Sequence, residues 1–267
     1  AAPLNPNGRP NADVVVPWVN GLDVTRRPRG MWIIDFGVEM PLDQAACYEA
    51  PFQYVLRKVK PEREGNNRAA YRERWWLHVE PRPALRAATE SLPRYIATTR
   101  VAKHRVFVWL AHPTLPDSRL FAFARPDDYF LGVLQSRLHE AWSLKTGSTL
   151  EDRPFYTPTT CFDTFPFPWP PGAEPAGDPR VEAIASAARE LVCLRDRWLN
   201  PEGTADEELK KRTLTNLYNA RPEWLRIAHR RLDDAVLDAY GWPRDLPDDA
   251  ILECLLALNH QRSALPV

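Results

Sequence analysis

Residues 92–110 read LPRYIATTRVAKHRVFVWL, and this stretch decides the fold of the chain. Its β-branched and aromatic residues predict strand structure with alternate side chains on opposite faces. The residues predicted on the buried face are Ile96, Val101, Val106 and Val108. The cationic residues predicted to point outward are Arg94, Arg100, Lys103, His104 and Arg105. Such a surface could hold a polyanion, and arginine can bind guanine edges through two hydrogen bonds. The alternative is a solvated strand face without a ligand.

The pattern after this stretch alternates between strand and helix. Residues 120–124 predict a further strand, and Asp127 and Asp128 are suited to begin a helix over residues 129–146. The aromatic tail TPTTCFDTFPFPWP occupies residues 157–170. Trp75 and Trp76 are flanked by arginines and could stack on bases, but the apolar pattern favours a place in the core.

Charge is distributed unevenly along a chain that is neutral overall. The 267 residues carry 35 Lys+Arg and 35 Asp+Glu, whereas residues 57–105 carry 13 basic and 5 acidic residues. Net charge therefore does not indicate nucleic-acid binding, although its local distribution is compatible with it. The bias toward arginine suits phosphate and base recognition, and it also follows from a GC-rich genome.

The four cysteines, Cys47, Cys161, Cys193 and Cys254, lie far apart without a Cys-x-x-Cys pair. This predicts a reduced, cytoplasmic protein and no zinc or other metal site. We expect no membrane partner, because no apolar run is long enough to span a bilayer. The chain opens AAPLN without methionine, and we expect it to be a fragment of a longer protein.

Composition and periodicity predict four segments: a linker over residues 1–30, a globular domain over 31–170, a linker over 171–179, and a C-terminal helical region over 180–267. Helical spacing in the last region predicts helices over residues 181–199, 223–240 and 248–259, with 213–218 as a connecting segment. The predicted fold class is α+β, with a mixed or antiparallel sheet and helices followed by a small α-helical C-terminal region.

Two loops carry charges that could contact a nucleic acid. Arg26, Arg27 and Arg29 lie close together at a predicted loop tip and could grip phosphates; a solubilising loop is the alternative. Glu151 could accept from a cytosine amino group and Arg153 could donate to guanine O6 and N7. The alternative for this second loop is a surface ion pair of small energetic weight.

The sequence lacks the common catalytic and cofactor motifs. Its 11 glycines form no Gly-x-Gly loop for a nucleotide or S-adenosylmethionine. Motifs of the Asn-Pro-Pro-Tyr, His-Glu-x-x-His and Gly-x-Ser-x-Gly types, and a nuclease Pro-Asp…Glu-x-Lys pair, are also missing. These observations favour a module with no catalytic residues and no cofactor of its own.

Several short motifs together resemble one family. They are Trp18–Asp23 with Trp32–Phe36, Pro93–Ala97 with Lys103–Val106, Tyr129–Ser136, Tyr156–Phe162 with Phe165–Pro168, and Leu232–Trp242. In this order they resemble the target-recognition domain and C-terminal helical region of MmeI-like adenine-N6 DNA methyltransferases. Members of this family act in type II restriction–modification, often fused to an endonuclease, and are related to phage-defence methyltransferases.

The resemblance implies that a missing N-terminal portion of the parent protein would bind S-adenosylmethionine and hold any nuclease. It also implies that the linker over residues 1–30 leads from a missing catalytic domain and that residues 31–170 are a DNA target-recognition domain. The family's catalytic residues map to nothing in this chain. Its variable base-reading pair falls on Glu151 and Arg153, and a second variable position falls on Ser118 or Arg119. The implied partners are double-stranded DNA and the missing methyltransferase domain of the same chain.

The resulting hypothesis is a sequence-specific DNA recognition module that reads base edges while the missing domain flips and methylates an adenine. The candidate base-reading residues are Glu151, Arg153, Arg100, Lys103, His104, Arg105, Ser118 and Arg119. The candidate phosphate-binding residues are Arg26, Arg27, Arg29 and Arg94. The alternative is a protein–protein interaction or scaffold module that makes no DNA contact.

Overall fold

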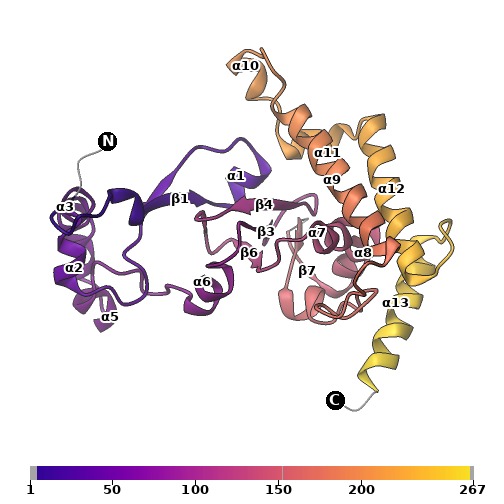
Figure 1. Ribbon diagram of the computed structural model, residues 1–267, viewed down its shortest axis with the longest axis horizontal. Helices are drawn as coiled ribbons and strands as arrows, with labels where there is room; N and C mark the ends of the chain where they lie inside the picture. Colours follow the sequence, from indigo (N-terminus) through magenta and orange to yellow (C-terminus); the bar gives the residue numbers. More distant parts are fainter. Residues whose placement is uncertain (1–4, 152, 265–267) are drawn as a thin grey trace. The chain divides into compact units, whose positions relative to one another are not determined.

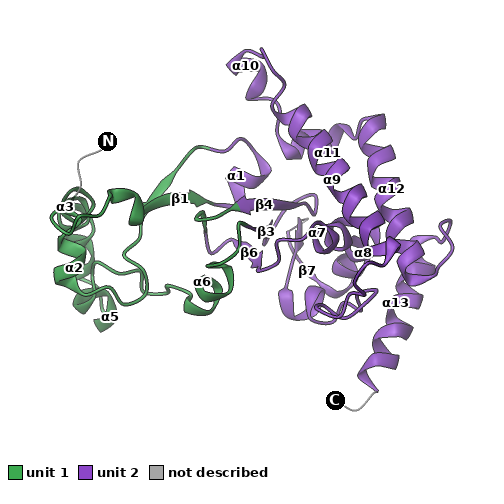
Figure 2. Ribbon diagram, in the orientation of Figure 1, with its two compact units in different colours: residues 1–19, 29–93, 111–115 green, residues 20–28, 94–110, 116–267 purple. Residues whose placement is uncertain are grey.

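The computed structural model describes residues 5–151 and 153–264, which form two compact units (Figure 2). The first unit comprises residues 1–19, 29–93 and 111–115, and the second comprises 20–28, 94–110 and 116–267. Small sheets with antiparallel strand pairs combine with many helices (Figure 1), which confirms the predicted α+β class. No helix within the described ranges is long and apolar enough to cross a membrane.

The first unit is built on strands β1 (Val15–Val19) and β2 (Trp32–Ile34), which pair antiparallel with Val16 opposite Ile33. A short third strand, β5 (Leu115–Pro116), begins in this unit and completes the order β2-β1-β5. The helices of the unit are η1 (Asn11–Asp13), α2 (Leu42–Ala46), α3 (Glu49–Lys58), α4 (Lys60–Glu64), α5 (Ala69–Glu73) and α6 (Pro83–Thr89). The segment that the sequence predicts as a linker thus contains η1 and β1.

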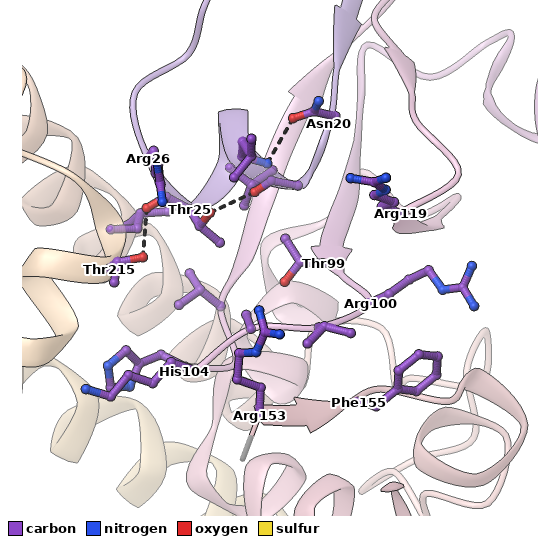
Figure 3. Close-up of a pocket in the computed structure, with 18 of the residues that line it drawn as sticks. Asn20, Thr25, Arg26, Thr99, Arg100, His104, Arg119, Arg153, Phe155 and Thr215 are labelled. Carbon is purple, nitrogen blue, oxygen red and sulfur yellow. Dashed lines mark hydrogen bonds between the residues drawn. The ribbon is translucent and has the colours of Figure 1, made fainter. Parts of the chain in front are cut away.

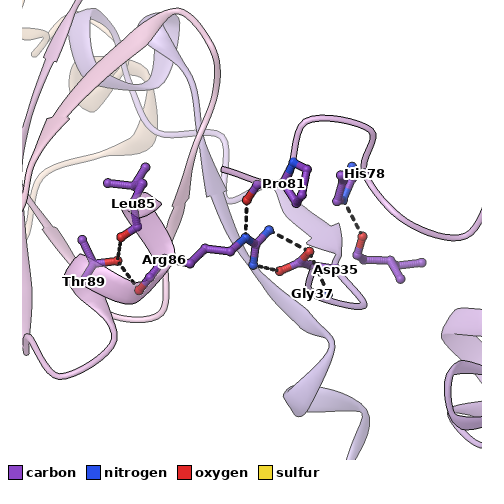
Figure 4. A network of polar contacts seen from close by, with 8 residues as sticks. Asp35, Gly37, His78, Pro81, Leu85, Arg86 and Thr89 are labelled. Carbon is purple, nitrogen blue, oxygen red and sulfur yellow. Dashed lines mark hydrogen bonds and ion pairs between the residues drawn. The ribbon is translucent and has the colours of Figure 1, made fainter. Parts of the chain in front are cut away.

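An apolar core and a partly buried ion pair join the elements of the first unit. The core includes Phe36, Tyr48 and Trp75, so the predicted core position of Trp75 is confirmed. The carboxylate of Asp35 follows β2 and accepts two hydrogen bonds from the guanidinium of Arg86 on α6, at 2.6 and 2.9 Å (Figure 4). This pair fixes the end of β2 to α6.

The second unit contains the sheet β4-β3-β6, formed by β3 (Arg94–Thr99), β4 (Phe107–Ala111) and β6 (Leu120–Phe123). Strands β3 and β6 pair antiparallel, with Ile96 opposite Phe123. Every residue of β3 after Arg94 is buried, on both faces of a strand that lies between β4 and β6 and also contacts helix α1 (Gly21–Thr25). The predicted alternation of buried and outward residues is therefore wrong for β3.

The helix predicted over residues 129–146 is two helices, α7 (Asp128–Gln135) and α8 (Arg137–Thr146). Ser136 has an extended backbone between them, with ψ of 156°. Its hydroxyl donates to Val133 O at 2.7 Å and accepts from the amide of His139, so it ends one helix and caps the next. The predicted cap at Asp127 is confirmed, because its carboxylate accepts from Phe130 N at 2.8 Å.

The remaining elements of the second unit are α1 (Gly21–Thr25), the hairpin β7 (Ser148–Leu150) and β8 (Arg153–Phe155), η2 (Pro158–Phe162), α9 (Pro179–Leu199), α10 (Asp206–Leu209), α11 (Leu214–Ala220), α12 (Glu223–Tyr240) and α13 (Asp248–Ser263). The three predicted C-terminal helices are thus confirmed, as α9, α12 and α13. The predicted connecting segment over residues 213–218 is instead mostly helix α11.

Helix α9 joins the C-terminal helices to the β4-β3-β6 sheet. It packs along both α12 and α7 (Figure 1). Gly132 on α7 is fully buried, and a β-carbon there would come within 2.7 Å of the Ile184 side chain and 3.1 Å of Ala188 on α9. The buried guanidinium of Arg195 on α9 donates to Gln135 Oε1 and to Phe107 O, both at 3.1 Å. These contacts place α7, α9 and β4 in one core.

Candidate nucleic-acid interface

A pocket of about 610 Å³ opens on the second unit where α1, the β3–β4 loop, the start of β6, the β7–β8 hairpin and α11 meet (Figure 3). Its described lining includes no aspartate or glutamate. It includes six basic residues: Arg26, Arg100, Lys103, His104, Arg119 and Arg153. The pocket therefore has the electrostatic character of an anion-binding surface.

Helix α1 forms one wall of the pocket. Asn20 caps the helix, accepting from the amides of Leu22 at 2.9 Å and Asp23 at 3.3 Å, while Asp23 accepts from Asn20 N at 3.0 Å. This reciprocal capping box begins a helix that is otherwise too short to be stable alone. The hydroxyl of Thr215 on α11 donates to Thr25 O at 2.9 Å and so attaches α1 to α11.

Arg100 lies at the end of β3, where the backbone leaves the sheet. Its amide donates to Arg119 O at 2.9 Å, and its carbonyl accepts from Tyr156 N at 2.8 Å. Its guanidinium lies 5.3 Å from the ring centre of Phe155 and also donates to Ser118 O at 3.4 Å. The backbone bonds bring Arg100 and Arg119 to the same pocket, while the backbone carbonyl of Ser118 is engaged by Arg100.

Lys103 and His104 occupy the loop between β3 and β4, and both contact one residue of α11. Lys103 Nζ donates to Asn219 Oδ1 at 2.7 Å, and His104 Nε2 lies 2.9 Å from the same oxygen. The His104 ring also packs near Tyr218, with ring centres 5.9 Å apart. A contact over more than 110 residues of sequence thus orders two side chains of the pocket.

Arg105 differs from its neighbours, because its side chain points into the protein and only 6% of the residue is exposed. Its guanidinium donates to Thr98 Oγ1 at 3.2 Å, to Thr99 O and to Pro154 O at 3.4 Å, and lies 4.9 Å from the ring centre of Tyr156. Burial lowers the pKa of Arg105 to about 10. Arg105 therefore ties the end of β3 to β8 beneath the pocket.

Glu151 and Arg153 lie at the tip of the β7–β8 hairpin. Arg153 Nη2 donates to Glu151 Oε2 at 2.6 Å, and the two side chains are 48% and 72% exposed. Glu151 has a left-handed backbone, with φ of 59°, which the hairpin turn requires. Arg153 lines the basic pocket and brings this pair to its rim.

The predicted phosphate-binding residues are placed differently from one another. Arg26 lines the pocket, whereas Arg27 Nη1 donates to Leu199 O at 2.9 Å. Arg94 donates to Asp128 Oδ1 at 2.8 Å and its guanidinium lies 3.8 Å from the ring centre of Trp109. Arg29 belongs to the first unit. Of the four, Arg26 is the one that joins the basic pocket.

Sequence reasoning missed the walls supplied by α1 and α11. The pattern Asn20-x-x-Asp23 is a capping-box signal that could have revealed α1, and Thr213 three residues before Asn216 could have indicated the start of α11. No local signal places Asn219 beside Lys103, because that contact depends on the tertiary fold.

The chain is similar in sequence and fold to known DNA-modifying proteins. Residues 54–169 match the family model described as the MmeI target recognition domain. This part of the chain is therefore similar to an MmeI target recognition domain, which confirms the resemblance predicted from the sequence.

Two individual proteins are similar to the chain. DNA methyltransferase A of Bacillus subtilis (strain 168) is 29% identical over 150 residues, which cover 55% of this chain and 15% of that protein. The structure of the Type IIL restriction–modification enzyme MmeI in complex with DNA matches with a TM-score of 0.74 and 17% identity, over 96% of this chain and 32% of that one. The chain thus spans a third or less of either protein's length, and the structural match shows a shared fold.

Proposed function

We propose that this chain is the sequence-specific recognition module for double-stranded DNA in a site-specific adenine-N6 DNA methyltransferase of restriction–modification or phage defence. The observation that carries the proposal is the basic pocket, whose described lining brings together Arg26, Arg100, Lys103, His104, Arg119 and Arg153 without an acidic residue. The match to a target recognition domain supports the same conclusion.

The pocket's side chains suit two kinds of DNA contact. Arginine and lysine donate hydrogen bonds and accept none, so Arg100, Lys103 and Arg119 are suited to guanine O6 and N7 or to phosphate oxygens. Glu151 adds the acceptor that can pair with a cytosine amino group. Arg26 is assigned to a phosphate. Arg105 is assigned a supporting role, because its N–H groups are directed to protein atoms.

The chemistry of methylation belongs to another part of the parent protein. The chain has no Gly-x-Gly loop, and the basic pocket offers no acidic residue in its described lining to hold a ribose. We therefore assign S-adenosylmethionine, the adenine-flipping step and any endonuclease to the portion that this chain does not contain. This chain's residues bind and orient the duplex.

Salt-dependent binding of a short duplex tests the DNA contact. The affinity of the chain should fall steeply between about 50 and about 200 mM salt, and Arg26→Gln should reduce the slope of log affinity against log salt by about one. Arg244→Gln is the matched control, because Arg244 pairs with Asp238 on the exposed surface of the helical region. A chain with no salt-dependent affinity would instead be a scaffold module.

Exchanging the charges at the hairpin tip tests sequence reading. In the parent methyltransferase, Glu151→Arg combined with Arg153→Glu should change the preferred base at one position of the site, by a factor of about 5 to 150 for about 1–3 kcal/mol of discrimination. The pair is exposed, so the exchange should cost the fold less than about 1 kcal/mol. Sequencing of methylated bases measures the outcome, and an unchanged site would reject this assignment.

A further inference from the structure

Helix α11 lies outside the segment that matches the target recognition domain, yet it forms part of the pocket wall. Leu214 and Thr215 line the pocket directly. One turn further along, the amide oxygen of Asn219 contacts Lys103 at 2.7 Å and His104 at 2.9 Å. A single oxygen on α11 thus holds two adjacent basic side chains of the β3–β4 loop.

The chemistry of these groups fixes the direction of the hydrogen bonds. A lysine ammonium only donates, so the Asn219 atom beside Lys103 is the oxygen. The same oxygen can only accept, and His104 therefore donates from Nε2. Lys103 uses one N–H in this contact and retains two, which can meet acceptors on a base edge. Guanine presents two such acceptors, O6 and N7, in the major groove.

Helix α11 is itself held firmly at several points. Thr213 caps it by accepting from Asn216 N at 3.1 Å. The hydroxyl of Tyr218 lies 3.0 Å from His229 Nε2 and accepts from Arg195 Nη1 at 3.3 Å. A side chain can position another group only if its own support is rigid, and these contacts supply that support.

We propose that Asn219 is a positioning residue for base recognition, holding Lys103 and His104 so that Lys103 selects guanine at one position of the DNA site. This inference rests on the proposed function. It extends the recognition site from the target recognition domain into the C-terminal helices.

The test selects bound duplexes from a randomised pool with the 267-residue chain and sequences them. Asn219→Ala should lower the guanine preference at one position by about fivefold or more, because Lys103 is no longer held. The salt dependence of binding should stay unchanged, since no charge is removed. Asn219→Asp keeps an oxygen acceptor and should retain most of the preference. Asn216→Ala is the control on the same helix, because the Asn216 amide donates to Lys211 O rather than to the pocket.

A double-mutant cycle separates positioning from a general structural effect. In a Lys103→Gln background, Asn219→Ala should change the base preference no further. The inference is overturned if Asn219→Ala behaves like Asn216→Ala, or if its effect persists without Lys103. A wild-type chain that binds duplexes without salt dependence would overturn the proposed function as well. If the wild-type chain shows both salt dependence and base preference, an Asn219→Ala variant with an unchanged base preference rejects this inference alone.

Discussion

Asp233 on α12 is a buried carboxylate whose ionisation should oppose folding. Its Oδ1 accepts from the backbone amide of Arg137 at 2.8 Å, at the start of α8, and its Oδ2 lies 4.0 Å from Arg137 Nε. Burial raises the pKa of Asp233 from 3.8 to about 7, despite the hydrogen bond and the charge of Arg137, which lower it; the nearby Glu140 and Asp234 raise it further.

The size of the effect follows from the two pKa values. The difference between 3.8 and about 7 corresponds to about 4 kcal/mol, at about 1.36 kcal/mol for each pKa unit. Between those values the folded state binds more protons than the unfolded state, so the free energy of unfolding falls as the pH rises through this window. Below about pH 4 Asp233 is protonated in both states and costs the folded state nothing. Above about pH 7 it is ionised in both states, and the folded state bears the full cost of about 4 kcal/mol.

Asp233→Asn should remove this pH dependence while keeping an oxygen that accepts from Arg137 N. Relative to the wild type, the variant's free energy of unfolding should be similar near pH 4 and higher by up to about 4 kcal/mol near pH 8. Urea unfolding of both chains across this range measures the difference, and Asp245→Asn, which removes an exposed carboxylate, controls for the loss of one negative charge. A difference that is constant with pH, or a variant less stable at high pH, would refute the reasoning.

Two further substitutions test the packing of each unit. Gly132→Ala should lower the free energy of unfolding by about 1–3 kcal/mol, because the new β-carbon would press on the stiff, buried Ile184 side chain. Urea unfolding measures this loss. An unchanged unfolding midpoint would show that α7 and α9 can move apart without cost. Arg86→Ala should lower the free energy of unfolding by about 3 kcal/mol, because it leaves the buried Asp35 carboxylate without its cationic partner. Arg82→Ala breaks an exposed pair and should lower it by less than about 1 kcal/mol. Equal shifts of the melting temperature for these two variants would contradict this account.

The sequence predicted those parts of the fold that depend on local pattern. The apolar stripes of α9, α12 and α13 repeat at helical spacing, and the helices appear where they are predicted. The break at Ser136 was missed, because the apolar pattern continues through it and only the cap geometry reveals two helices. The burial of both faces of β3 was missed for a different reason: it depends on tertiary packing, which includes contacts with α1 near the start of the chain.

The candidate site was likewise predictable only where it depends on local sequence. Clustered cations identified Arg100, Lys103 and His104, although the structure places them on a loop beyond β3 rather than on a strand face. The burial of Arg105 could not be foreseen, since its hydrogen-bond partners include Pro154, 49 residues away. The contact of Asn219 with Lys103 likewise exists only in the folded chain.

The buried guanidinium of Arg195 limits where this chain can be joined to a related chain in order to change the DNA sequence that the proposed recognition module binds. It bonds to Gln135 on α7 and to the carbonyl of Phe107 on β4, so the sheet and α9 share one interior. A chimera joined in the proline-rich segment at residues 171–179 would separate these partners unless the donor and recipient interiors match. Grafts intended to transfer a recognition sequence should therefore carry α9, α11 and α12 together with the strands.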